Sequence, residues 1–231
     1  MVPDGAPSWL VFLCSVFLVG IGLYLVGVAI DDYWLRMLTK PLPVLALMAW
    51  TARAAPDRVG RAGLVGLGLG LGGDMLLEAS AATFLPGLIS FMLGHIAYIV
   101  CFSWGARRLA PLQAVPMLGY TAAAAVILVP ALEDLAIPVV IYMVVISLMA
   151  WRAAAYAEAI GRWAWAAPVG ALLFLFSDTL IAVDRFVEPI DGIRPAIILT
   201  YWLGQAGIAA GIVLTTGARA ATASPAASAA G

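Results

Sequence analysis

Eight apolar runs of about 20 residues follow one another along this chain of 231 residues. A helix of that length spans the roughly 30 Å hydrocarbon core of a bilayer. The chain is 64% hydrophobic and 11% charged, so it lacks the polar surface that a water-soluble domain of this size needs. We predict an all-α polytopic membrane protein with about eight helices, at 9–29, 34–53, 61–79, 84–103, 113–130, 135–152, 163–183 and 195–216.

The predicted membrane domain covers residues 1–216, and the low-complexity segment GARAATASPAASAAG at 217–231 is expected to be a disordered tail. No cleavable signal peptide is expected, because the first nine residues contain no Lys or Arg. Cys14 and Cys101 both fall inside predicted helices, where free thiols are ordinary, and we expect no disulfide.

The stretch GLVGLGLGLGGDMLLE, from Gly63 to Glu78, is rich in glycine and ends in acids. A phosphate-binding loop would need a strand before it, a helix after it and usually a basic residue at its end. Here the glycines lie within a run that already has spanning length. Gly66 and Gly70 are four residues apart, a spacing that lets membrane helices approach closely. We interpret the glycines as a packing face.

The distribution of basic residues predicts the orientation in the membrane. Eight lie on the side that carries the termini and four on the opposite side: Arg53, Arg58, Arg61, Arg107, Arg108, Arg152, Arg162 and Arg219 against Arg36, Lys40, Arg185 and Arg194. Positively charged loops favour the cytoplasm, so both termini are expected there. The expected location is a bacterial inner membrane.

Polar residues inside the membrane are costly and usually mark a functional site. At 1.5 Å per residue, Asp74 lies about 20 Å along its helix from the cytoplasmic side, and Asp178 about 22 Å along another. Lys40, Tyr142 and Tyr201 share this outer half, while His95 and Gln205 lie near mid-depth. We predict a cavity open to the outer side, with carboxylates, lysine and tyrosines in its wall and the histidine toward its floor.

Each of these residues also has a structural interpretation. The aspartates could lie at headgroup level, Lys40 could extend its side chain to the surface, and His95 could be a hydrogen-bonded core residue. The tyrosines could belong to an interfacial aromatic belt. Glu78 and Asp184 lie closer to the surface along their helices, and we expect them to form a solvated rim.

The two halves of the chain show a weak internal similarity, which suggests a 4+4 pseudo-repeat. The third and fourth helices carry GGDMLLE and LGHIAY, and the seventh and eighth carry FSDTLIA and TYWLGQ. Two repeats of four helices would have the same orientation and be related by an axis along the membrane normal. Such an arrangement could bring Asp74 and Asp178 together.

An ordered set of motifs resembles the YhhN-type lysoplasmalogenase family from Lys40 to Gln205. The motifs are KPLPVLALM, GD with a leucine-rich end, FxxGxxxFxxGHxxY, IPVVIYMVVISLMAW, GALLFLFSDTLIAVDRF and TYWLGQ. Many members have a serine shortly before the GD aspartate, where this chain has glycines, so a hydrogen-bond partner for Asp74 is missing or supplied elsewhere. The resemblance points to these site residues: Lys40, Asp74, His95, Tyr98, Tyr142, Ser177, Asp178, Tyr201 and Gln205.

The resemblance implies hydrolysis of the vinyl ether bond of a lyso-phospholipid, releasing a fatty aldehyde and a glycerophospho-alcohol. Protonation of the alkene carbon gives an oxocarbenium ion, to which water adds. By analogy with glycoside hydrolysis, this chemistry needs one protonated carboxylic acid and one carboxylate. Asp74 and Asp178 are the candidate catalytic pair, with their roles left open. Lys40 could hold the partner ionised or meet the lipid phosphate.

Three alternatives remain open at this stage. A metal hydrolase could use Asp74, Asp178 and His95 as ligands, a proton-coupled transporter could use the same intramembrane acids, and a packing protein would need neither. We expect no metal, no cofactor and no nucleic-acid partner. The sequence leaves the oligomeric state open.

Overall fold

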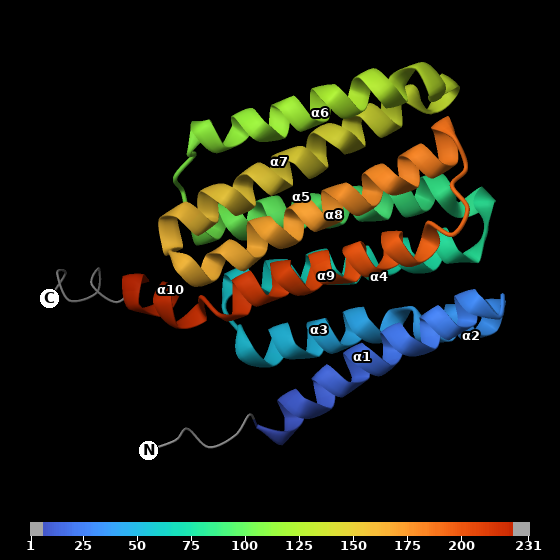
Figure 1. Cartoon of the computed structure of the whole chain (residues 1–231). Coiled ribbons are helices and arrows are strands. Elements are labelled where there is room, and N and C mark those ends of the chain that lie inside the picture. Colours follow the sequence, from blue (N-terminus) through green and yellow to red (C-terminus); the bar gives the residue numbers. More distant parts are fainter. Residues whose placement is uncertain (1–6, 224–231) are drawn as a thin grey trace, which may run out of the picture.

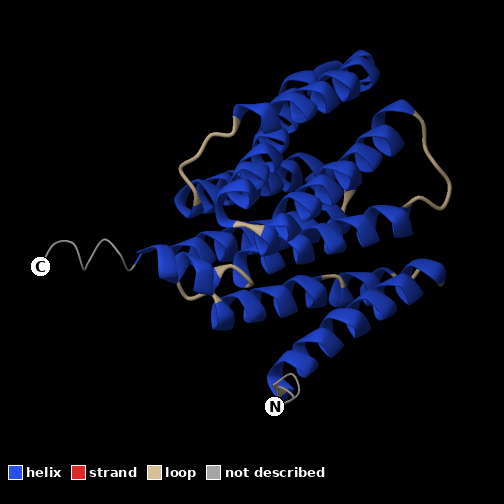
Figure 2. Cartoon of the chain, turned by 60° about the vertical axis from the view of Figure 1, so that its left-hand side comes forward, coloured by secondary structure: helices blue, strands red, loops and turns tan. Residues whose placement is uncertain are grey.

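The computed structural model describes residues 7–223, and within that range every regular element is a helix. The helices lie roughly side by side in one bundle (Figures 1 and 2). Their bounds are α1 Ser8–Ala29, α2 Tyr33–Thr39, α3 Pro41–Ala54, α4 Arg58–Ala79, α5 Phe84–Gly105, α6 Ala114–Leu128, α7 Ala136–Ile160, α8 Ala166–Ala182, α9 Arg194–Val213 and α10 Thr216–Ala223.

Short helical turns extend several of these elements. The 3₁₀ turns are Ala81–Thr83, Pro111–Gln113, Val129–Ala131, Glu133–Leu135 and Arg162–Trp165. A π-helical turn, Val183–Val187, continues α8 at its C-terminal end. These turns lengthen the helical segments at the two ends of the bundle.

Seven helical segments of the described chain are long and apolar enough to cross a membrane, so the predicted all-α polytopic class is confirmed. They are Ser8–Ala29, Arg58–Ala79, Ala81–Gly105, Pro111–Ala131, Glu133–Ile160, Arg162–Val187 and Arg194–Ala220. The predicted helix at 34–53 differs, because it is divided into α2 and α3.

The division falls between Lys40 and Pro41. Pro41 has no backbone N–H, and its ring would clash with the carbonyl of the preceding turn, so it starts a helix rather than continuing one. Thr39 is the last residue of α2, and its hydroxyl donates to the Leu35 carbonyl at 2.6 Å. Lys40 therefore lies at a joint between two helices, with its side chain buried in the bundle.

The most extensively packed helix pairs are α4 with α5 and α8 with α9, and glycines let their backbones approach closely. A Cβ atom on Gly170 would lie 2.5 Å from the Gly204 carbonyl oxygen, and one on Gly94 would lie 3.1 Å from the Gly66 carbonyl oxygen. Backbone therefore packs against backbone in both pairs. These matching contacts are what the predicted 4+4 repeat would require, although the repeat itself stays a prediction.

The glycine stretch of α4 makes room for side chains of other helices. A Cβ on Gly66 would collide with the ring of Tyr98, one on Gly70 would lie 2.7 Å from Gln205 Nε2, and one on Gly73 would overlap Phe91. Residues three or four apart share one helix face. The glycines therefore form a packing face, as predicted, and this face of α4 contacts residues that belong to the candidate site.

The start of α1, α10 and three of the connections lie at one end of the bundle (Figure 1). There Arg219 of α10 donates to both Asp57 oxygens, at 2.9 and 3.2 Å. Burial tends to raise the pKa of Asp57, but hydrogen bonds from Arg219 and the Gly60 amide outweigh it and lower this pKa.

Residues 217–223 are thus helical rather than a disordered tail, because Arg219 anchors them to the start of α4. Residues 224–231, the rest of the predicted tail, lie outside the described residues.

The predicted helix at 135–152 extends to Ile160, so Arg152 lies within α7 rather than at its end. Its guanidinium donates to the carbonyls of Ala106 and Arg108, at 2.7 and 2.8 Å. The buried cation thus satisfies backbone carbonyls that follow the C-terminal end of α5.

Candidate active site

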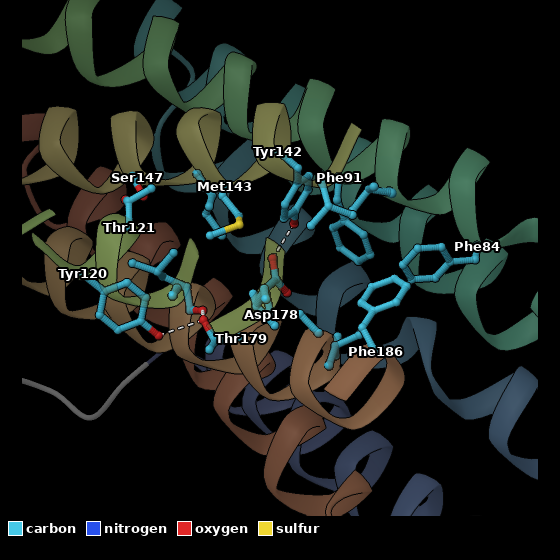
Figure 3. Close-up of a pocket in the computed structure, with 18 of the residues that line it drawn as sticks. Phe84, Phe91, Tyr120, Thr121, Tyr142, Met143, Ser147, Asp178, Thr179 and Phe186 are labelled. Atoms are coloured by element: carbon cyan, nitrogen blue, oxygen red, sulfur yellow. Dashed lines mark hydrogen bonds between the residues drawn. The ribbon is translucent and has the colours of Figure 1, made fainter. Parts of the chain in front are cut away.

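Asp178 of α8 lies at the end of a hydrogen-bonded row of three side chains. Tyr142 of α7 donates its hydroxyl proton to Asp178 Oδ2 (Figure 3). The same hydroxyl oxygen lies 2.9 Å from Nε2 of His95 on α5, and His95 Nε2 lies 3.8 Å from Asp178 Oδ2. We call these three residues the Asp178 row.

The direction of these bonds follows from the number of protons available. A tyrosine hydroxyl has one proton, so when Tyr142 donates to Asp178, it must accept a proton from His95 Nε2. His95 is 1% exposed, and its Nδ1 has no hydrogen-bond partner within the described chain. If Asp178 is protonated instead, all the bonds reverse and His95 Nε2 becomes the final acceptor. The row can therefore carry a proton either way.

Asp178 opens into an apolar pocket between α5, α6, α7 and α8 (Figure 3). The empty space in the pocket, including open solvent at its edge, is about 690 Å³. Of the lining residues, Asp178 is the one with a charged side chain, and its side chain is 14% exposed. Tyr120 of α6 donates to Thr179 at 2.7 Å on the same wall.

Asp74 of α4 belongs to a second group of hydrogen bonds. Tyr201 donates to Asp74 Oδ2 at 2.7 Å, Gln205 Nε2 donates to the Tyr201 hydroxyl at 3.2 Å, and Tyr98 donates to Gln205 Oε1 at 2.6 Å. Lys40 Nζ lies 3.9 Å from Asp74 Oδ1. Tyr201 thus supplies the partner for Asp74 that the glycines before it cannot provide.

Aromatic rings separate the Asp74 group from the Asp178 row. The Phe174 ring centroid lies 4.7 Å from that of His95 and 5.0 Å from that of Tyr201, both edge-on. Asp74 is 3% exposed and does not line the pocket, whereas Phe91 in front of it does. Of the two aspartates, Asp178 is the one that lines the pocket.

The predicted cavity wall therefore needs correction. Asp178 and Tyr142 reach the pocket, while Lys40, Asp74 and Tyr201 lie behind it with His95 and Gln205. Aromatic side chains occupy the space that the depth arithmetic assigned to an open cavity. Ser177 also points elsewhere, because its hydroxyl donates to the Ile197 carbonyl at 2.8 Å and ties α8 to α9.

Glu78 is not part of a solvated rim, and that prediction is wrong. Its side chain is 1% exposed and accepts hydrogen bonds from Arg194 at 2.6 Å, Arg36 at 3.0 Å, Tyr24 at 3.1 Å and Lys40 at 3.2 Å. Lys40 likewise does not extend to the surface. Three cations around one buried carboxylate compensate its desolvation, and we call this set the Glu78 cluster.

Sequence reasoning missed the partners in the Glu78 cluster because they lie on other helices, 38 to 116 residues away along the chain. One local signal was available. Glu78 lies four residues after Asp74, so both carboxylates project from the same face of α4, toward the same neighbours. Asp184, the other residue assigned to the rim, is partly exposed and accepts from the Ile190 amide at 2.8 Å.

Within residues 7–223, no three His, Cys, Asp or Glu side chains are grouped so that they could hold a metal ion. The ligand set considered for a metal hydrolase, Asp74, Asp178 and His95, is accordingly not assembled. Aromatic rings stand between Asp74 and the other two residues.

These features define a polytopic α-helical membrane protein that holds a carboxyl group in the wall of an apolar pocket, hydrogen-bonded through a tyrosine to a buried histidine. The model of the YhhN family matches residues 35–212. The chain belongs to the YhhN family.

Characterised relatives are similar over most of the chain. Bovine lysoplasmalogenase TMEM86A is 31% identical over 191 residues, covering 76% of this chain and 77% of the relative. Human lysoplasmalogenase TMEM86B is 32% identical over 177 residues, covering 74% and 73%. Mouse lysoplasmalogenase TMEM86B is 30% identical over 201 residues, covering 84% and 80%. No solved structure matches the chain significantly.

Proposed function

We propose that this protein is a lysoplasmalogenase, which hydrolyses the vinyl ether bond of an alkenyl lyso-phospholipid to a fatty aldehyde and a glycerophospho-alcohol. One observation carries the proposal: of the residues that line the pocket, Asp178 is the one with a carboxyl group, and the rest of the lining is apolar or carries hydroxyl groups. An alkenyl chain fits such a lining, and its first carbons would lie against a proton donor. The names of the similar relatives support the same reaction.

The first step is proton transfer to carbon. The carboxylic acid form of Asp178 donates its proton to the second carbon of the alkenyl chain, and the electron pair of the double bond forms the new C–H bond. The positive charge moves to the first carbon and the ether oxygen, giving an oxocarbenium ion. The Asp178 carboxylate that remains stabilises this cation by its charge.

Water completes the reaction. It adds to the first carbon of the chain and loses a proton to the Asp178 carboxylate, forming a hemiacetal. The hemiacetal then loses its hydroxyl proton while the ether oxygen gains one, and the C–O bond breaks. One water is consumed, one aldehyde and one alcohol are released, and Asp178 ends the cycle protonated.

We further propose that the Asp178 row restores this proton when it is lost. A protonated His95 would pass its Nε2 proton to Tyr142, and Tyr142 would pass its own proton to Asp178. His95 would finish neutral, with its proton on Nδ1. The 2.9 Å contact between His95 and Tyr142 supports a direct transfer.

Asp74 is the second carboxylate of this proposal. It lies behind Phe91 and Phe174 and is held by Tyr201 and Lys40, so it acts on the site through its charge and through Tyr201. It would favour the cationic intermediate without touching the substrate. Asp178 is thus assigned the acid and base roles, and Asp74 a positioning and electrostatic role.

Purified protein should release a fatty aldehyde from a 1-alkenyl lyso-phospholipid. The 1-alkyl analogue, which lacks the double bond, should not be cleaved, because no carbon can accept the proton. The rate should fall in D₂O, because proton transfer to carbon is expected to be slow. Cleavage of a 1-acyl lyso-phospholipid in place of the alkenyl lipid would overturn the proposal. Lipid uptake into vesicles without aldehyde release would favour the transporter alternative.

We propose that both ends of the chain face the cytoplasm of a bacterial inner membrane. The start of α1 and helix α10 lie at the same end of the bundle, which supports a common side (Figure 1). A reporter fused to the C-terminal end should show a cytoplasmic location, and one inserted near Asp134 should show the outer side. The opposite result would place the pocket in the cytoplasmic half of the membrane.

A further inference from the structure

Arg185 belongs to the π-helical turn that follows α8, at the end of the bundle opposite α10 (Figure 1), and its guanidinium lies against two aromatic residues of the pocket lining. Phe84 and Phe186 both line the pocket, and their rings meet edge-on with centroids 5.7 Å apart (Figure 3). The Arg185 guanidinium carbon lies 3.9 Å from the Phe84 centroid and 5.9 Å from the Phe186 centroid. A guanidinium at this distance from an aromatic ring is held by a cation–π interaction.

Arg185 lies in the π-helical turn Val183–Val187, which also contains Phe186 of the pocket lining. Such turns are rare and frequently occur at functional sites. Arg185 follows Asp178 by seven residues, the last of them in the π-helical turn, so the helical segment rises by about 10 Å between the two residues. One substrate can therefore contact both residues.

Arg185 differs from the other cations at this end of the bundle. Arg36, Lys40 and Arg194 all bind Glu78. Arg185 is exposed, and it forms no ion pair with any acidic side chain among residues 7–223. The ring contact occupies the guanidinium π surface, and the N–H groups along its edge remain available for a ligand.

We propose that Arg185 binds the phosphate of the lyso-phospholipid headgroup while the chain occupies the pocket; this rests on the proposed function. Seven bonds separate the carbon that accepts the proton from the phosphorus atom, about 8 Å when extended. With contacts of about 3 Å at both ends, the path from the Asp178 carboxyl group to the guanidinium is longer than the backbone rise of about 10 Å, and the long arginine side chain spans the difference. Arg185 would thus set how far the chain enters the pocket, as a residue that determines specificity for phospholipids.

The test compares two substrates that share the vinyl ether and the chain, a 1-alkenyl lyso-phospholipid and the matching 1-alkenylglycerol without phosphate. In detergent micelles free of phosphate, Arg185→Gln should raise KM for the phospholipid about 10-fold and leave kcat nearly unchanged, because a charge-assisted hydrogen bond is lost. The alkenylglycerol kinetics should not change. Arg185→Lys should recover part of the affinity, because it keeps the charge but not the planar pair of donors.

Arg108→Gln is the matched control, since Arg108 pairs with Glu158 at 2.7 Å and precedes α6. It should affect neither substrate. Equal losses on both substrates for Arg185→Gln would show that Arg185 only packs against Phe84 and Phe186, and would overturn the proposal. An effect that appears solely in phospholipid vesicles, equally for both substrates, would assign Arg185 to the surrounding bilayer and also overturn it.

A binding measurement separates this proposal from the proposed catalysis. The saturated 1-alkyl lyso-phospholipid and 1-alkylglycerol cannot be cleaved, and their binding can be measured by calorimetry on the full chain. Arg185→Gln should weaken binding of the alkyl lyso-phospholipid and leave binding of the alkylglycerol unchanged. If the wild-type protein cleaves neither alkenyl substrate, the proposed function fails, and this binding difference still decides the role of Arg185.

Discussion

Asparagine in place of Asp178 is expected to lower aldehyde release from an alkenyl lyso-phospholipid by about 10²–10⁴-fold, the usual contribution of a general acid. The asparagine side chain keeps the volume and still offers an oxygen to the Tyr142 hydroxyl. It cannot protonate carbon. The melting temperature in detergent should therefore change little, while the steady-state rate collapses.

Variants of neighbouring residues sharpen this test. Asp184→Asn removes a partly exposed carboxylate on the same segment and should retain activity. Tyr142→Phe removes the hydroxyl between His95 and Asp178, and it should slow turnover, because the row can then no longer return a proton to Asp178. Asp74→Asn should cost less than Asp178→Asn. The reverse order, with Asp178→Asn nearly active, would move the acid to Asp74.

Glutamine in place of Glu78 is expected to destabilise the protein by about 3 kcal/mol. Removing one partner of a buried ion pair typically costs 3–5 kcal/mol, because the opposite charge stays buried without compensation. The lower figure applies since the Arg194 side chain is 47% exposed and water screens part of its charge. For a chain of this size, the melting temperature should fall by about 6–12 °C.

The matched control is Glu188→Gln, which removes an exposed acid from the connection between α8 and α9. It should melt like the wild type. Adding Arg194→Gln to Glu78→Gln should recover part of the lost stability, because one uncompensated cation is removed with its partner. If Glu78→Gln melts like the wild type, the Glu78 cluster does not hold α2, α4 and α9 together.

The positions of the helices follow from the sequence because insertion into a bilayer depends on local hydropathy. The predicted spans 9–29 and 84–103 correspond to Ser8–Ala29 and Phe84–Gly105 within two residues. The break at Pro41 was also encoded locally, since proline cannot continue a helix without cost. Because membrane helices often tolerate proline, hydropathy alone predicts one continuous helix at 34–53.

Part of the candidate site could likewise be predicted from the sequence, and part depended on the tertiary structure. The sequence by itself marked Asp74, Asp178, His95 and Tyr142, because polar residues are costly in hydrocarbon and their helical depth can be counted. It could not decide which aspartate reaches the pocket. That depends on Phe91 and Phe174, whose rings stand between Asp74 and the pocket and which look like ordinary apolar residues in the sequence.

Only the tertiary structure shows that Glu78 is buried and paired with cations. Counted along α4, this residue lies near the membrane surface, which suggested contact with water. Glu78 instead accepts hydrogen bonds from Arg194, 116 residues further along the chain, and from Tyr24, 54 residues before it. Hydropathy and helical depth are properties of one segment, whereas the burial and pairing of a charge depend on side chains that separate helices bring together.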